Sequence, residues 1–348
     1  MTSRPSLATR VTLSLAIVLP MAVALAACST DAPRRDAIDD RSPDVSPPMT
    51  AQESSYYEAA SRIELPEVTP ENDSGIHNLV HLSPNIVSGS EPHGEQAFVK
   101  LAKMGIKTVL SVDGKAPDVE LAKKHGLRYV HVPIQYSGID LEEMTEIAKT
   151  FRELEGPFFV HCFHGKHRGP AGAAVGRVVL DGVPREQAIA EMRQWCGTSK
   201  SYDGLYGAIA AGDIPSAEKT RALEWDFPEA HRYTGFRHAM IELTRAHDNL
   251  KHLYRNDWQV DPEHPDIDPG NEATKIAMLF QTTADLDEVK DRPEDFRTWL
   301  SESVDASNEL REALTAWKQG QADQESVDTA HEKVTELCGT CHKSYRND

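Results

Sequence analysis

The sequence predicts an α/β domain with a central, mostly parallel sheet, followed by an all-α four-helix bundle. Between residues 78 and 212, short β-branched runs alternate with helical stretches, which is typical of a sheet with helices on its faces. From residue 229 to the end, the spacing of apolar residues is helical and β-branched runs are almost absent. The turn-rich stretch 213–228 is expected to link the two domains.

The charge of the chain limits its partners. The 348 residues include 37 Lys and Arg against 55 Asp and Glu, so the net charge is −18. Nucleic-acid phosphates and anionic lipid headgroups repel such a chain. We therefore expect no nucleic-acid partner and no docking to membranes through basic residues.

The first residues have the order of a secretory signal. Arg4 and Arg10 precede an uncharged run over 11–27, which is short for a permanent membrane helix. The run ends in Leu-Ala-Ala before Cys28, which resembles a lipoprotein signal box. We therefore predict a signal peptide over 1–27, a lipid on Cys28, and a place in the periplasm or on the outer cell surface. The alternative is a plain signal peptide with an incidental cysteine.

Residues 28–77 are rich in Asp, Pro, Ser and Arg. Because such a segment buries little apolar surface, we predict a disordered tether. Beyond it, the α/β part is expected to hold strands over 107–112, 128–133 and 157–161, and helices over 94–104, 118–125, 141–154, 170–180 and 185–195.

A loop whose residue types are suited to catalysis follows the strand 157–161. It reads His161-Cys162-Phe163-His164-Gly165-Lys166-His167-Arg168-Gly169, and a helix follows it directly. Backbone N–H groups in such a loop, together with the helix N-terminus, bind a phosphate, and Arg168 can hold two of its oxygens. The same positive field is expected to lower the pKa of Cys162 and make it a thiolate nucleophile.

This loop resembles the signature of the cysteine-dependent protein tyrosine and dual-specificity phosphatases, over residues 78–212. The resemblance implies that Cys162 is the nucleophile, that Arg168 binds phosphate and that His161 orders the loop. Residues 165–168 are also similar to the plant and fungal branch that acts on inositol pyrophosphates. Residues 88–92 resemble the segment that leads into the site in bacterial members. The substrate implied is a phosphorylated protein or a small phosphate ester.

The chain departs from this family at two positions. Gly169 replaces the Ser or Thr whose hydroxyl eases departure of the cysteine, so turnover is expected to be slow. The family's aspartate general acid has only Asp140 as a counterpart, and Asp140 is also placed to cap the helix 141–154. Other interpretations of the loop are a buried structural thiol beside an exposed arginine, or a sulfurtransferase. Cys196 is expected to be a core thiol and not a resolving cysteine.

The C-terminal part is expected to hold four antiparallel helices over 229–256, 272–286, 294–319 and 324–345. Near its end, Cys338-Gly339-Thr340-Cys341-His342 has the spacing for covalent attachment of one c-type haem. Residues 229–348 resemble cytochromes c prime and c556, which implies thioether bonds at Cys338 and Cys341 and an iron ligand at His342. The alternatives are a disulfide or half of a zinc site.

The opposite axial position of the iron is open in the sequence. The resemblance to c556 favours Met240, while His238 and His247 compete and a vacant position is a further alternative.

Two hypotheses follow for the whole chain. The first is an exported, lipid-anchored phosphatase that works through a cysteinyl-phosphate and is coupled to a haem that senses redox state or exchanges electrons with a partner. The second is a non-catalytic phosphate-binding protein fused to an electron-transfer or gas-sensing cytochrome.

Overall fold

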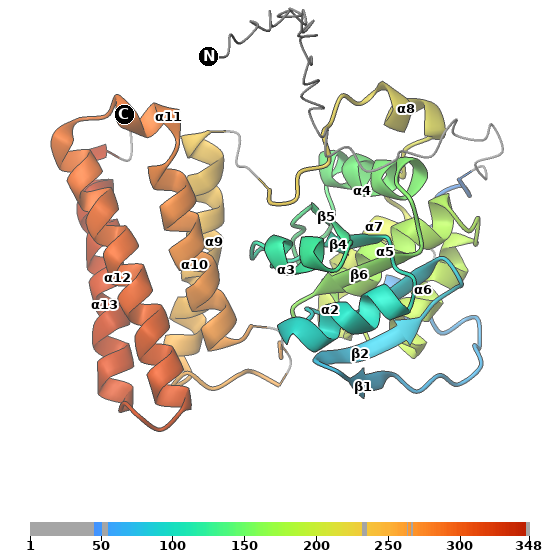
Figure 1. Cartoon of the computed structure of the whole chain (residues 1–348), viewed down its shortest axis with the longest axis horizontal. Coiled ribbons are helices and arrows are strands. Elements are labelled where there is room, and N and C mark those ends of the chain that lie inside the picture. Colours follow the sequence, from blue (N-terminus) through green and yellow to red (C-terminus); the bar gives the residue numbers. More distant parts are fainter. Residues whose placement is uncertain (1–44, 51–54, 232–234, 263, 266, 346–348) are drawn as a thin grey trace, which may run out of the picture. The chain divides into compact units, whose positions relative to one another are not determined.

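The computed structural model describes residues 45–50, 55–231, 235–262, 264–265 and 267–345 (Figure 1). The predicted signal peptide over 1–27 and the predicted lipidation site Cys28 lie outside these residues. Among the described helices, none combines the length and the apolar character that crossing a membrane requires.

A mixed sheet forms the centre of the α/β part, as predicted. In the described residues it has six strands in the order β1-β2-β3-β6-β4-β5. Strands β3, β6, β4 and β5 run parallel, whereas β1 and β2 are antiparallel to their neighbours. The strands β1, β2 and β3 were not predicted. The strands are β1 (Glu71–Asp73), β2 (Ile76–His81), β3 (Ile86–Ser90), β4 (Thr108–Ser111), β5 (Arg128–His131) and β6 (Phe158–Cys162).

Strand β6 lies at the centre of the parallel part, and all five of its residues are buried. Phe158 and Val160 face one apolar core, and Phe159 between them faces the other. Burial of each such side chain contributes roughly 1.5–3 kcal/mol. This explains the continuous apolar run in the sequence, because both faces of a parallel sheet are covered.

Helices cover both faces of the sheet (Figure 1). Residues of α4, α5, α6 and α7 pack in one core, and residues of α2 and α3 pack in the other. The helices of this part are α1 (Tyr56–Ala59), α2 (Gly94–Lys103), α3 (Val119–Lys124), α4 (Leu141–Glu153), α5 (Arg168–Val179), α6 (Arg185–Gln194), α7 (Asp203–Ala210) and α8 (Ala217–Ala222), with a 3₁₀ turn at Lys200–Tyr202.

The prediction of a disordered tether over 28–77 is wrong for its described part. Ala59 and Ala60 are buried in the core, and the Met49 N–H donates to the carbonyl of Ala210 at 2.8 Å. The Tyr57 N–H donates to the Asp203 carboxylate at 2.7 Å. A few well-placed apolar residues thus fix a segment whose average composition is polar.

The stretch 213–228 is also more than a linker, because it packs on the α/β part. It contains α8, and the carbonyl of Thr220 accepts from the buried ammonium of Lys149 at 2.9 Å. Phe227 is 2% exposed and belongs to the same core as α4 and α5.

The C-terminal region, Phe236–Tyr345, is helical, as predicted. Four long helices share one apolar core, in which α10 packs on α9 and α12, and α12 packs on α13. The first of them begins at Phe236 and not at residue 229, directly after Gly235 at φ 108°. The helices are α9 (Phe236–Arg255), α10 (Pro269–Ala284), the short α11 (Asp287–Lys290), α12 (Glu294–Lys318) and α13 (Gln324–Tyr345).

Helix α5, which begins at Arg168, is held to α6 by a buried ion-pair network. The Arg177 guanidinium donates to both carboxylate oxygens of Glu191, at 2.8 and 2.7 Å. It also donates to Asp181 at 2.6 Å. The side chain of Glu191 is only 2% exposed, so its charge depends on Arg177 for compensation.

We expect Arg177→Met to lower the free energy of unfolding by about 3–5 kcal/mol, because it leaves Glu191 buried and unpaired. Adding Glu191→Met to that variant should restore most of the loss. Urea unfolding followed by circular dichroism measures both values. If single and double variants are equally destabilised, the charge of Glu191 is not what Arg177 compensates.

Candidate functional site

The carboxyl ends of the parallel strands meet at one edge of the sheet. Ser90 pairs in register with Cys162, and Ser111 pairs with both His161 and His131. Loops that follow such strands commonly bind ligands in open α/β sheets. The residues singled out in the sequence therefore lie where the topology favours a site.

The predicted loop runs from the end of β6 into the first turn of α5. Cys162 is 2% exposed and Arg168 is 3% exposed. Gly165 has φ 73°, and a Cβ there would lie 2.2 Å from the carbonyl carbon of Gly89 on β3. A Cβ at Gly169 would lie 3.1 Å from the Cys162 nitrogen, which is tight but less severe. Backbone contacts with β3 thus fix the loop at Gly165.

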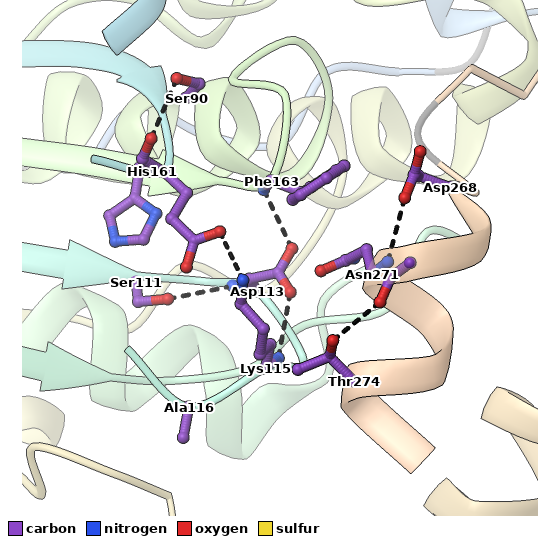
Figure 2. Close-up of polar contacts among 12 residues, drawn as sticks. Ser90, Ser111, Asp113, Lys115, Ala116, His161, Phe163, Asp268, Asn271 and Thr274 are labelled. Carbon is purple, nitrogen blue, oxygen red and sulfur yellow. Dashed lines mark hydrogen bonds and ion pairs between the residues drawn. The ribbon is translucent and has the colours of Figure 1, made fainter. Parts of the chain in front are cut away.

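Asp113, just beyond β4, connects the arginine to the loop. Its carboxylate accepts from Arg168 Nη2 at 2.5 Å, from the Phe163 N–H at 3.0 Å and from the Lys115 N–H at 3.0 Å. Figure 2 shows this carboxylate pointing toward Phe163 and Lys115. Burial raises the pKa of Asp113, but Arg168, the Lys115 N–H and the charge of Lys275 outweigh it and hold the pKa at about 2. Asp113 is therefore charged at neutral pH.

The expected lowering of the Cys162 pKa is wrong for this structure. Burial raises the pKa of Cys162 above its ordinary value, against the opposing effects of Arg168 and the backbone at Gly169 and His167. The negative charge of Asp113 raises the Cys162 pKa further, because it disfavours a thiolate nearby. The thiol form therefore dominates until the balance of charge at the site changes.

Two tyrosines line the arginine side of the loop. The Arg168 guanidinium carbon lies 4.2 Å from the centre of the Tyr136 ring, a cation–π contact. The Tyr202 ring lies 5.0 Å from Tyr136 and 4.4 Å from the His167 ring. The ring of Tyr136 thus restrains the Arg168 side chain, and the ring of Tyr202 restrains that of His167.

The structure brings the predicted loop residues together, and each of them contacts a different neighbouring residue. Lys166 is exposed, and its carbonyl accepts from Thr198 Oγ1 at 2.6 Å. The carbonyl of His164 accepts from Asn78 Nδ2 at 2.8 Å. His161 is buried behind the loop, where its Nε2 lies 2.9 Å from the Tyr129 hydroxyl.

The structure supports the capping interpretation of Asp140. Its carboxylate accepts from the Glu143 N–H at 2.9 Å, and the Glu143 side chain accepts from the Asp140 N–H at 2.9 Å. This reciprocal pair is a capping box at the start of α4. Cys196 is 4% exposed and packs in the core, as expected of a core thiol.

Asp113, Tyr136 and Tyr202 were missed in the sequence. A signal existed for Asp113, because it follows a predicted strand and parallel strands end at one edge. No local pattern marks Tyr136 or Tyr202, which come from separate segments and meet only in the folded chain.

In the helical region, the predicted haem residues line one cavity of about 340 Å³. Cys338, Cys341 and His342 of α13 lie on its wall. Met240 and His247 of α9 line the same cavity. The rest of the wall is largely apolar and includes Phe236, Leu243, Ile276, Phe280, Phe296, Trp299 and Leu300. Both cysteines are free thiols, and no three His, Cys, Asp or Glu side chains of the described residues converge as metal ligands. The cavity wall therefore carries two thiols and an imidazole within a largely apolar lining, to which Asp248 and Lys251 add charge.

The pairing of α9 with α13 ranks the candidate axial ligands. His247 Nε2 lies 3.0 Å from Thr335 Oγ1, and Trp258 Nε1 donates to Asp328 at 2.7 Å, so the two helices are antiparallel. His342 is seven residues beyond Thr335, and Met240 is seven residues before His247, about 10 Å along each helix. Met240 is thus level with His342. His238 is exposed and is not among the residues that line the cavity.

Comparison with known proteins finds similarity over about a third of the chain. Over 119 residues the chain is 29% identical to the dual specificity protein phosphatase TpbA of Pseudomonas aeruginosa, strain UCBPP-PA14. This stretch is 34% of the chain and 54% of the relative, so the chain spans about half the length of the curated relatives it matches. No protein-family model matches.

Among solved structures, the crystal structure of P. aeruginosa TpbA aligns with 44% of this chain and 92% of its own, at 25% identity and a TM-score of 0.36. The core catalytic domain of the PP-IP phosphatase SIW14 from S. cerevisiae aligns with 45% of this chain and 93% of its own, at 19% identity and a TM-score of 0.36.

Two buried histidines at this edge of the sheet give a testable dependence on pH. Burial lowers the pKa of His161 to about 3 and that of His131 to about 4. Both stay neutral in the folded chain, whereas the unfolded chain binds a proton at each below about pH 6.5. The contribution of these two histidines to stability is therefore complete above pH 6.5 and falls as the pH decreases toward 4.

We expect His161→Asn to reduce the slope of unfolding free energy against pH, between pH 6 and 4.5, by about 1.4 kcal/mol per pH unit. One fewer proton is then taken up on unfolding. Urea unfolding at a series of pH values measures the slope. Equal slopes in variant and parent would mean that His161 is protonated in the folded chain.

Proposed function

We propose that the α/β part is a cysteine-dependent phosphatase of the tyrosine and dual-specificity type. The observation that carries the proposal is the loop between β6 and α5, which places the Cys162 thiol and the Arg168 guanidinium around backbone N–H groups at a helix start. The similarity of this part to TpbA supports it.

In the proposed reaction, the Cys162 sulfur attacks phosphorus and the bond from phosphorus to the ester oxygen breaks. Water then hydrolyses the cysteinyl-phosphate and releases phosphate. Arg168 and the loop N–H groups stabilise the charge on the phosphoryl oxygens in both steps. Because burial keeps Cys162 protonated, its proton moves to an oxygen of the dianionic phosphoryl group as the sulfur attacks.

Asp140 remains the proposed proton donor to the leaving group, although its contacts are those of a helix cap. A donor engaged in a cap serves poor leaving groups weakly, so aryl phosphates suit this site better than alkyl phosphates. The proposed substrates are a phosphorylated protein or a small phosphate ester. One solved structure of TpbA is a complex with pTyr.

We expect Cys162→Ser to reduce hydrolysis of p-nitrophenyl phosphate more than about 1,000-fold. Binding of inorganic phosphate should be retained, because backbone groups and Arg168 form the cradle. Steady-state kinetics and calorimetry on the same preparations measure both. Cys196→Ser is the matched control and should keep its activity.

Two outcomes distinguish the hypotheses. If the Cys162→Ser variant stays active, Cys162 is not the nucleophile. If the unaltered chain binds phosphate without hydrolysing the ester, the α/β part is a non-catalytic phosphate-binding domain.

We also propose that the helical region is a c-type cytochrome bundle. The observation that favours it is the cavity that Cys338, Cys341 and His342 share with Met240. The two thiols would hold one haem c covalently, and His342 and Met240 would bind its iron. When bound, the haem supplies one-electron chemistry, for exchange with a redox partner or for sensing redox state on behalf of the phosphatase. The apolar wall would exclude water from it.

Haem attachment takes place outside the cytoplasm, and this accords with the proposed signal peptide and with lipid on Cys28. The proposed location is the periplasm or the outer cell surface, with the lipid as a membrane anchor.

We expect the chain, produced in a periplasm that attaches haem c, to keep haem on a denaturing gel stained for peroxidase activity. Cys338→Ser combined with Cys341→Ser should lose the stained band, because no thioether bond can form. Cys196→Ser should keep it. Haem that separates from the unaltered chain on the gel would contradict covalent attachment.

A further inference from the structure

One face of α10 packs against the loop that follows β4. Met278 Sδ accepts from the Ala116 N–H at 3.0 Å. A Cβ placed on Gly114 would lie 2.6 Å from Lys275 Cε and 3.0 Å from Lys275 Nζ. Asn271 lies one turn before Lys275, so the three side chains follow the i, i+4, i+7 spacing of a single helix face. Figure 2 shows Asn271 on α10 beside the loop of Asp113 and Lys115.

Two of these side chains are polar, buried and without partners. Lys275 is 6% exposed, and its ammonium has no hydrogen bond or ion pair with any described residue. Asn271 is 3% exposed, and neither its Oδ1 nor its Nδ2 has a partner in the described part of the chain. By contrast, the buried ammonium of Lys149 contacts Glu153 at 2.5 Å and the Thr220 carbonyl at 2.9 Å. The Lys275 ammonium lacks such partners, and so does the buried Asn271 amide, so an anion beside them would satisfy both groups.

On the side of the loop that follows β4, the other charges near Lys275 are paired with one another. Asp113 pairs with Arg168 at 2.5 Å, and Glu91 pairs with Lys115 at 2.6 Å. Lys275 therefore adds a positive charge in excess, next to the residue that follows Asp113. Because Asp113 holds the phosphate-binding arginine, this excess charge lies at the border of the proposed phosphate site.

We propose that Lys275 and Asn271 form a second anion subsite, which binds a second phosphoryl group of the substrate while the first lies in the Cys162 loop. The proposal rests on the proposed phosphatase function and deepens it: the substrate class becomes diphosphates and other phosphate esters that carry a further phosphoryl group. The ammonium and the amide Nδ2 both donate to phosphoryl oxygens. The helical region thereby completes the site of the α/β part.

The test compares inorganic phosphate with pyrophosphate on the full-length chain. Calorimetry on the Cys162→Ser chain gives both dissociation constants without consuming the ligand. We expect pyrophosphate to bind at least about tenfold more tightly than phosphate, which corresponds to one charge-assisted hydrogen bond or more. Adding Lys275→Met should weaken pyrophosphate by about tenfold or more, and phosphate by much less. Lys333→Met, on α13, is the matched control and should change neither value.

A purely structural role for Lys275, as a countercharge for Asp113, predicts a different result. Lys275→Met would then weaken both ligands by the same factor and lower the melting temperature. The proposed subsite predicts instead that the ligand-free melting temperature is unchanged or higher, because the Lys275 ammonium has no hydrogen bond or ion pair among the described residues to lose. Equal loss of both ligands, or no preference for pyrophosphate in the parent, would overturn the proposal.

These readouts remain valid whatever the outcome for catalysis. If the unaltered chain fails to hydrolyse p-nitrophenyl phosphate, the proposed reaction fails, while the preference for pyrophosphate and its loss in Lys275→Met still decide the subsite. Asn271→Leu provides a second variant, and we expect it to lower the same preference to a smaller extent.

Discussion

The ion pair between Arg168 and Asp113 is the constraint on which the site depends. It joins the first residue of α5 to Asp113, two residues beyond β4, and the same carboxylate accepts from the Phe163 N–H in the loop. Sheet, loop and helix are thereby fixed to one another through a single charged group. The carboxylate also offsets the effect of the Arg168 charge on Cys162. The ion pair therefore fixes the position of the arginine but raises the pKa of the thiol.

The features that could be predicted from the sequence are those carried by short, continuous motifs. Cys162 and Arg168 lie on one loop whose strand and helix are both locally encoded, and Cys338, Cys341 and His342 lie within two turns of one helix. The features that were missed depend on tertiary contacts, as Tyr136 does above Arg168. The pKa of Cys162 was misjudged because neither burial nor the Asp113 carboxylate can be read from a motif.

Segments of polar composition join the α/β part more closely than their sequence indicates. Residues near Tyr57 hold to α7 through the half-buried Asp203, and residues near Thr220 hold to α4 through the buried Lys149. Average composition predicts whether a segment can form a core of its own. It does not predict whether a segment can cover the core of its neighbour, because that requires only one or two well-placed side chains.

The two glycines of the loop differ in whether their surroundings leave room for a side chain. Gly165 meets the backbone of β3 at Gly89, so a side chain there would displace the strand, and this position requires glycine. Gly169 meets only the edge of the Cys162 peptide, where a shift of a few tenths of an ångström makes room. The hydroxyl that this chain lacks is therefore one substitution away. The expected slow hydrolysis of the cysteinyl-phosphate thus depends on a position where a small side chain can be placed without a change in the loop backbone at Gly165.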